Sequence, residues 1–358
     1  MKTEVAFVVD ALPGMGGGER VVSQALALFP DASLYTLFYN QAAFTHTRIA
    51  EHPVVSSLID HLPLSQTHYR SYLPLMMMAV RQFDLSRFDL VISFSYAIAH
   101  AVSVRPGQRH LSYTFTPMRY AWRNYSINGM LSPTRHFASW FNAFFRKWDA
   151  RAVAQVDQFA AVSKDIAGWI ETAYHRDSQV IYPPVELRRF RPHYPRENFF
   201  ITVSRLVAHK HLALIVETFS AMKLPLVVVG EGPELAHLRQ AAASNIKFTG
   251  YLPDVDVADL LGRARAYVSA AEEDFGIAMI EAQAAGCPVI TYQKGGAIET
   301  VIDGQTGLFF KEQSRQSLCD AVERFTQTQD SFFENFLIEN ARKFGVERFE
   351  EEFSKFVR

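Results

Sequence analysis

The chain has little cysteine, no long hydrophobic run and almost no net charge, and each of these excludes a class of protein. Only Cys287 and Cys319 occur among 358 residues, so we expect no disulfide framework, and the count suits a reducing cytoplasm. The apolar stretches at residues 5–9 and 72–80 are far shorter than the ~20 residues that span a bilayer. Without a signal-peptide pattern at the N-terminus, the sequence predicts a cytoplasmic protein, soluble or peripheral to a membrane.

Composition and length indicate a folded protein of two domains. Hydrophobic residues make up 49% and charged residues 20% of the chain, as in globular proteins, and 358 residues exceed one ordinary core. Four prolines over residues 182–195 resist both helix and sheet pairing, which marks a boundary. We predict an N-terminal domain over residues 1–185, a C-terminal domain over 186–335 and a helical tail over 336–358.

The small net charge conceals an asymmetry between the two halves. Residues 1–192 carry 19 Lys and Arg against 14 Asp and Glu, a net +5, and the remainder carries 17 against 23, a net −6, which together give −1. A basic first half suits anionic lipid surfaces or phosphate-bearing acceptors, so peripheral membrane association through this half is one expectation. Scattered basic residues and a near-neutral balance disfavour a nucleic-acid partner.

Apolar strands alternate with helical segments in both halves, which is typical of parallel βαβ units. The predicted strands are residues 5–9, 33–37, 90–93, 111–114, 159–162, 199–204, 226–229, 246–249, 266–269 and 288–291. The predicted helices are residues 19–28, 211–222, 233–243, 256–263 and 276–286. We therefore expect an α/β fold of two Rossmann-like domains facing each other across a cleft. Amphipathic C-terminal helices would pack on the domains, the first included.

Glu273 and Glu281 form the most informative pair. Glu273 falls in a polar loop, and Glu281 lies inside the helix that follows; at ~100° per residue the helix turns Glu281 back toward the loop. Two carboxylates would then face one site beside a helix N-terminus that attracts anions. Hydroxyl acceptors next to a phosphate site suit a sugar nucleotide. A solvated helix that carries two glutamates explains the spacing about equally well.

Two cations follow the predicted strand that ends at Ser204. Arg205 and Lys210 would lie at the carboxyl edge of a parallel sheet, where ligands bind, and could clamp a diphosphate; ordinary surface cations are the alternative.

The glycine-rich loop Gly14–Gly18 allows close approach of the backbone to a ligand. It matches neither a dinucleotide fingerprint nor a P-loop, so a nicotinamide dehydrogenase is disfavoured, and a structural turn remains the alternative.

No motif predicts a metal site. Asp254-Val-Asp256 superficially matches a metal-binding pattern, but its place at a helix start favours helix capping. No His and Cys residues have zinc spacing. The start of the segment Lys294–Glu299 could instead serve a phosphate or a sugar through its free N–H groups. We therefore expect no cofactor and no metal.

Taken together, these motifs resemble the retaining GT-B glycosyltransferases of family 4, and within it the bacterial mannosyltransferases of O-antigen and exopolysaccharide assembly. The likeness covers nearly the whole chain. In order, the matching motifs are residues 14–18, Thr116–Trp122, Tyr182–Val185, Ser204–Leu206 with Lys210, Gly230–Pro233, Gly250–Leu252, Glu273–Gly276 with Glu281, and Gly295–Gly307.

The resemblance implies roles for the matching positions. Arg205 and Lys210 would bind the donor diphosphate, Glu281 the nucleoside ribose, and Glu273 the hydroxyls of the transferred sugar, so that Glu273, Arg205 and Lys210 form the catalytic set. Backbone groups of the glycine-rich loop and of the helix start would complete the donor site: Gly16, Gly17, Phe275, Gly276, Ile277 and Ala278. Such enzymes need no Asp-x-Asp metal site.

One position departs from the family. Phe115-Thr116-Pro117 stands where the family usually has His-Thr-Pro, whose histidine is associated with the transferred sugar and the reacting centre. Phenylalanine offers no hydrogen bond, so the chain supplies that contact differently, accepts a sugar with another hydroxyl pattern, or has lost activity. Phe115, Thr116 and Arg119 are the residues expected near the sugar or acceptor.

The leading interpretation is a retaining hexosyltransferase that moves mannose from GDP-mannose to a lipid-linked or oligosaccharide acceptor in polysaccharide or lipopolysaccharide biosynthesis. Its partners would be a nucleotide sugar and a glycan or lipid-linked acceptor. Two alternatives stay open: the same fold with a UDP-sugar donor, and a non-catalytic subunit that binds a sugar nucleotide.

Overall fold

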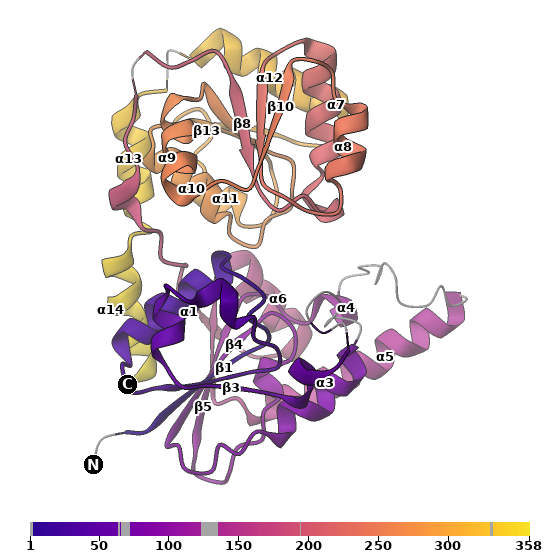
Figure 1. Ribbon diagram of the computed structural model, residues 1–358, viewed down its shortest axis with the longest axis vertical. Helices are drawn as coiled ribbons and strands as arrows, with labels where there is room; N and C mark the ends of the chain where they lie inside the picture. The colour runs from indigo at the N-terminus through magenta and orange to yellow at the C-terminus, as the bar shows by residue number, and fades with distance from the viewer. Residues whose placement is uncertain (1–2, 64, 66–71, 123–134, 194, 330–331) are drawn as a thin grey trace. The chain divides into compact units, whose positions relative to one another are not determined.

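The computed structural model describes residues 3–63, 65, 72–122, 135–193, 195–329 and 332–358 (Figure 1). The chain divides into two compact units: the first unit is Met1–Tyr182 with Glu350–Arg358, and the second unit is Pro183–Phe349. The division falls inside the proline-rich segment, of which Tyr194 lies outside the described residues. Residues 336–358 do not form a unit of their own, because those up to Phe349 belong to the second unit and the rest to the first.

A parallel sheet forms the centre of the first unit. Its strands are β1 (Val5–Val9), β2 (Ser33–Thr36), β3 (Val54–Ser56), β4 (Leu90–Ser95), β5 (Arg109–Thr114), β6 (Gln158–Ala161) and β7 (Ser178–Val180), in the order β3-β2-β1-β4-β5-β6-β7. The helices are α1 (Gly17–Leu28), α3 (Leu73–Ala79), α4 (Arg119–Trp122), α5 (Arg135–Ala152) and α6 (Lys164–Tyr174), with short 3₁₀ segments between them.

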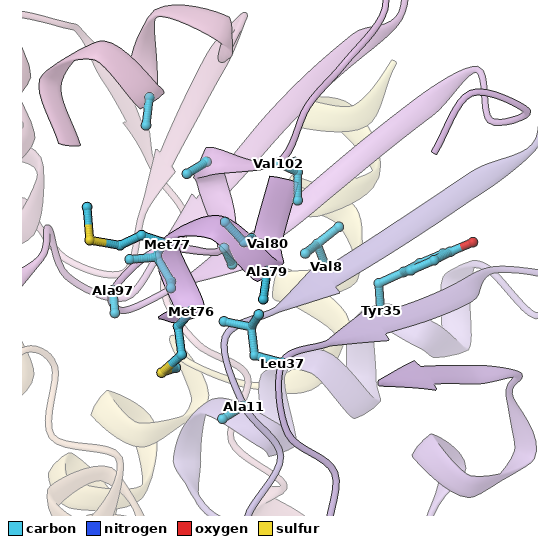
Figure 2. Packing of buried hydrophobic residues seen from close by; sticks show 14 of the residues in the cluster. Val8, Ala11, Tyr35, Leu37, Met76, Met77, Ala79, Val80, Ala97 and Val102 are labelled. Atoms are coloured by element: carbon cyan, nitrogen blue, oxygen red, sulfur yellow. The ribbon is translucent and has the colours of Figure 1, made fainter. Parts of the chain in front are cut away.

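The apolar run at residues 72–80 serves the core of the first unit. It forms α3, whose Met76 and Met77 are buried beside Val80, next to Val8 of β1 and Leu37 just after β2 (Figure 2). Burial of each such side chain contributes about 1.5–3 kcal/mol, which explains why a short hydrophobic run lies here. Among the described residues, no helix is long and apolar enough to cross a membrane.

The last helix, α14 (Val346–Val357), ends in the first unit. The ring of Phe353 lies 6.0 Å from the rings of Phe94 and Tyr113 and 6.5 Å from that of Phe29, centroid to centroid. Aromatic contacts of this kind bury large apolar surfaces. The prediction that C-terminal helices pack back on the first domain is confirmed for this segment.

The second unit is built on a second parallel sheet. Its strands are β8 (Phe200–Val203), β9 (Leu226–Val229), β10 (Ile246–Gly250), β11 (Ala266–Ser269), β12 (Val289–Tyr292) and β13 (Gly307–Phe310), in the order β10-β9-β8-β11-β12-β13. The helices are α7 (Leu212–Met222), α8 (Leu235–Ala241), α9 (Asp254–Arg263), α10 (Ile277–Ala284), α11 (Ala297–Thr300), α12 (Arg315–Thr328) and α13 (Glu334–Arg342). Figure 1 shows α7 and α8 on one side of the sheet and α9 and α10 on the other.

Both sheets have the Rossmann strand order, in which the chain starts in the middle, adds strands to one side and then crosses to the other. The crossing point lies between β1 and β4 in the first unit and between β8 and β11 in the second. The predicted α/β fold with two Rossmann-like domains is confirmed. Each predicted strand and helix has a counterpart whose ends agree within two residues. The strands β3, β7 and β13 and the helices α3, α4, α5, α6 and α12 were not predicted.

Candidate donor-binding site

The predicted donor residues of the second unit gather at the crossing point of its sheet. Arg205 and Lys210 follow β8, and Glu273 follows β11, the neighbouring strand. The carboxyl ends of parallel strands share one edge, and ligands of open α/β sheets bind there, where the strand order reverses. The topology therefore brings together residues that lie more than sixty positions apart in the chain.

Lys210 and Glu273 form an ion pair. The Lys210 Nζ atom lies 2.8 Å from Oε1 and 2.7 Å from Oε2 of Glu273, and the side chains are only 21% and 17% exposed. A charge-assisted pair that is largely shielded from water is stronger than an exposed one. The sequence predicted a diphosphate ligand and a sugar ligand at these positions, and the structure joins the two side chains directly.

Glu281 is held by a residue that the sequence analysis missed. Arg189, at the end of the 3₁₀ helix η8 (Leu187–Arg189), donates hydrogen bonds from one guanidinium nitrogen to Glu281 and from the other to Asp254. Asp254 is the first residue of α9, whose N-cap position is held by Pro253 and not by an aspartate, and the Asp254 carboxylate binds Arg189. An arginine five residues after the double proline was the available signal.

The charges of both glutamates affect the hydroxyl group of Tyr267. Burial raises the pKa of Tyr267, on β11, well above its usual value, and the negative charges of Glu273 and Glu281 raise it further. Each carboxylate destabilises the tyrosinate through charge repulsion. Each carboxylate also has a cationic partner. That both face one donor site stays a prediction.

Glycines shape the loops that carry these side chains. Gly295 has φ = +65°, and a Cβ there would lie 2.3 Å from the carbonyl oxygen of Glu273, so only glycine fits. The N–H of Gly296 donates to the same carbonyl at 2.7 Å. A Cβ at Gly230 would similarly meet the Ser204 carbonyl oxygen at 2.0 Å. The motif at 230–233 thus packs against the segment after β8, and the motif at 294–296 packs against the segment that carries Glu273.

The start of α10 offers backbone groups rather than side chains. Gly276 caps this helix at φ = +94°, so that Ile277 and Ala278 form its first turn, where N–H groups have no partner within the helix. The Phe275 ring is buried, and its centroid lies 5.4 Å from that of Phe344. Any contact of Phe275 with a donor would therefore involve its backbone, as predicted.

The side chain of Arg205, the other cation predicted to bind the diphosphate, is exposed.

In the first unit, the glycine-rich loop opens α1 as predicted, with Gly16 as the N-cap and Gly17 as the first helical residue. A Cβ on Gly18 would lie 3.5 Å from the ring of Phe115, so this ring packs against the helix start. Thr116 is buried, and its hydroxyl donates to the Pro117 carbonyl at 3.1 Å. Arg119, partly buried, begins α4.

Asp10, which the sequence analysis did not single out, connects the ends of β1 and β4. Its buried carboxylate accepts four backbone N–H bonds of 2.6–3.0 Å from residues 96–99. Burial raises the pKa of this carboxyl, and the hydrogen bonds oppose that rise. The bonds fix the loop that follows β4 beside the glycine-rich loop at the crossing point of the first sheet.

The part of the chain that the structure describes contains no group of three or more His, Cys, Asp or Glu side chains placed to hold a metal ion. The expectation of no cofactor stays a prediction.

Comparisons with known proteins find a family match in the second unit. Residues 185–344 match the family described as glycosyl transferases group 1. The O-antigen chain mannosyltransferase C of Escherichia coli is 30% identical over 166 residues, which cover 44% of this chain and 43% of that protein. The GDP-mannose-dependent alpha-(1-6)-phosphatidylinositol monomannoside mannosyltransferase of Mycobacterium tuberculosis is 36% identical over 141 residues, 34% of this chain and 36% of that protein. The chain thus spans less than half the length of these curated relatives.

Solved structures match along the whole chain. Sucrose-phosphate synthase from Thermosynechococcus elongatus has a TM-score of 0.78 at 16% identity, covering 99% of this chain and 98% of that one. HepE of Anabaena, in complex with UDP and glucose, has a TM-score of 0.75 at 16% identity, covering 99% of each chain. At this identity the likeness establishes the fold. The chain therefore has the GT-B fold, and its second unit contains the residues that match the glycosyl transferases group 1 family.

Proposed function

We propose that the chain is a retaining hexosyltransferase that moves mannose from GDP-mannose to a lipid-linked or oligosaccharide acceptor in polysaccharide or lipopolysaccharide biosynthesis. It would act in the cytoplasm, peripheral to the inner face of the membrane through its basic first half. The Lys210–Glu273 pair at the crossing point of the second sheet carries the proposal. The mannosyltransferase names of the relatives support the donor, and one relative is named for GDP-mannose.

The chemistry follows from the charges. A nucleoside diphosphate gains negative charge as it departs, and a fixed cation at that place stabilises the transition state. Arg205 and Lys210 would take this role, with Lys210 released in part from Glu273 as the diphosphate binds. Glu273 would then accept hydrogen bonds from the sugar, and Glu281 from the ribose. Phe275, Gly276, Ile277 and Ala278 would contribute backbone groups.

Thermal unfolding with a panel of nucleotides tests the proposal. Binding to the folded state stabilises it by about 2.7 kcal/mol when the ligand is present at 100 times its dissociation constant. We expect GDP-mannose and GDP to raise the unfolding temperature more than UDP-glucose, UDP-galactose, UDP or NAD. A larger rise in unfolding temperature with a UDP-sugar would show that the donor is a UDP-sugar and not GDP-mannose, in line with the UDP bound to HepE. The proposed enzyme class would then be unchanged. No rise with any sugar nucleotide would reject the proposal.

Phe115 favours a second candidate, a subunit that binds a sugar nucleotide without catalysis. Its ring packs on Gly18 and offers no hydrogen bond where the family histidine stands. We expect the wild-type protein to turn over its donor, and Phe115→His to change that rate by no more than about tenfold, the effect of about one hydrogen bond. Phe115→Leu, which keeps an apolar side chain there, is the control. Activity that appears only in Phe115→His would establish the non-catalytic candidate.

A further inference from the structure

Arg189 connects three segments of the second unit that are far apart in the chain. Arg189 lies in the segment that follows the double proline. Its guanidinium group binds Glu281 on α10 and Asp254 at the start of α9. Separations of 92 and 65 residues make this bridge a feature of the tertiary structure. We propose that Arg189 is a positioning residue that holds the Glu281 carboxylate toward the donor ribose and so sets a preference for ribonucleotides.

This inference rests on the proposed function, in which Glu281 accepts hydrogen bonds from the ribose. The burial of the group supports it, because the Glu281 side chain is 13% exposed and Arg189 23%. A carboxylate in such surroundings is ionised at a cost unless a cation lies beside it. The ionised form only accepts hydrogen bonds, and it accepts them from ribose hydroxyls more strongly than a neutral carboxyl does. The Arg189 guanidinium thus supplies the cation beside the Glu281 carboxylate.

The shape of the guanidinium group explains why arginine stands here. Its nitrogen atoms form a rigid fork, so that binding Asp254 with one arm fixes the direction in which the other arm meets Glu281. The carbon at its centre also lies 4.8 Å from the centroid of the Phe190 ring, which supports the group from one face. A lysine would supply the charge without the fork.

The opposite role, in which Arg189 competes with the ribose for Glu281, makes the opposite prediction. A competitor, once removed, would leave Glu281 open to the ribose and tighten binding of a ribonucleotide. A positioning residue, once removed, would leave Glu281 misdirected and weaken that binding. A residue needed only for folding would weaken all nucleotides alike. The ratio of two affinities therefore separates the three roles.

The experiment measures dissociation constants for GDP and 2′,3′-dideoxy-GDP by calorimetry, or for the UDP pair if UDP stabilises the protein more. We expect the wild-type protein to prefer the ribonucleotide by about ten- to a hundredfold, as for one or two hydrogen bonds to a charged group. Arg189→Met and Glu281→Gln should each reduce the preference to about threefold or less, and the double variant should lower it no further. Arg189→Lys should retain an intermediate preference.

Arg188 provides a matched control, because its partner Glu347 and the arginine itself are 73% and 84% exposed. Arg188→Met should keep the full preference. If Arg189→Met does not fold, Asp254→Asn tests the same bridge from its other end and should lower the preference partly. An unchanged or larger preference in the Arg189 variants would overturn the positioning role. A wild-type protein that binds neither nucleotide would instead reject the proposed function itself.

Discussion

Replacing Lys210 or Glu273 with alanine is expected to abolish sugar transfer while the fold is kept. Lys210→Ala removes a cation at the departing diphosphate, and the loss of one such preorganised group costs about 10²–10³ in turnover. Glu273→Ala removes a hydrogen-bond acceptor from the sugar and leaves Lys210 without its partner. Lys210 ends the short 3₁₀ helix η9 (Ala208–Lys210), and Glu273 follows β11. Both side chains lie outside the hydrophobic core, so each variant should still unfold cooperatively. Initial rates of transfer with the donor that the nucleotide panel selects measure the effect.

The two variants should differ in how they bind the nucleoside diphosphate alone. Without Lys210 the diphosphate faces the uncompensated Glu273 carboxylate, and affinity should fall by tenfold or more. Without Glu273 the lysine is freed for the phosphates, and affinity should stay equal or rise. The sign of the change therefore assigns Lys210 to the diphosphate and Glu273 to the sugar, which activity alone would not do.

An ion pair at the opposite edge of the same sheet provides the control. Arg263 Nε lies 2.6 Å from Glu197 Oε1, and the two residues lie at the amino ends of β11 and β8. Arg263→Ala should leave transfer within about twofold of wild type, because no donor contact is proposed at that edge. Wild-type turnover in both Lys210→Ala and Glu273→Ala would reject the site assignment, and equal losses in all three variants would point to damage to the fold.

Much of the second unit could be predicted from its sequence because its strands are short apolar runs separated by helices. Strand order places Arg205, Lys210 and Glu273 at one edge once the sheet is known to be parallel. Which of these side chains form ion pairs with each other could not be predicted from strand order. Lys210 meets Glu273 across 63 residues, and Arg189 meets Glu281 across 92, so both pairs depend on how loops of different length turn back over the sheet.

The strands that were missed share a physical reason. β3 and β7 have three residues each and are only partly buried, so they lack the hydrophobic run that marks β1 or β9. β13 is buried but has only four residues, the first of which is Gly307, and it adds to the sheet through β12. In such segments tertiary pairing, more than local pattern, determines the strand.

Replacing Asp149 with alanine is expected to destabilise the first unit by about 3–5 kcal/mol, the cost of breaking a buried charged network. Asp149, on α5, is fully buried, and its carboxylate lies 2.8 Å from His100 Nε2. It also accepts hydrogen bonds from Trp122 at 2.7 Å and from the Tyr174 hydroxyl at 2.8 Å. Burial and the nearby Asp149 raise the pKa of Tyr174 well above its usual value, so this hydroxyl remains a donor.

This network also bears on the site, because Trp122 ends α4, which begins at Arg119. His100 extends the network to Ser95 at the end of β4, where its Nδ1 atom lies 2.9 Å from the serine hydroxyl. One carboxylate therefore holds α4, α6 and the loop after β4 together. Asp149→Asn keeps one oxygen for Trp122 and Tyr174, so we expect it to cost only about 1–2 kcal/mol.

Tryptophan fluorescence reports on the first unit alone, because all four tryptophans of the chain, Trp122, Trp140, Trp148 and Trp169, lie in Met1–Tyr182. Urea unfolding followed at this signal therefore avoids the error of treating a two-unit protein as one transition. Domains are stable by about 5–15 kcal/mol, so a loss of 3–5 kcal/mol should move the midpoint well below that of the wild type. Nucleotide binding, assigned to the second unit, should be retained in Asp149→Ala at low urea, whereas transfer should fall because α4 loses its anchor. A change below about 1 kcal/mol would show that the carboxylate can be replaced without loss of the network.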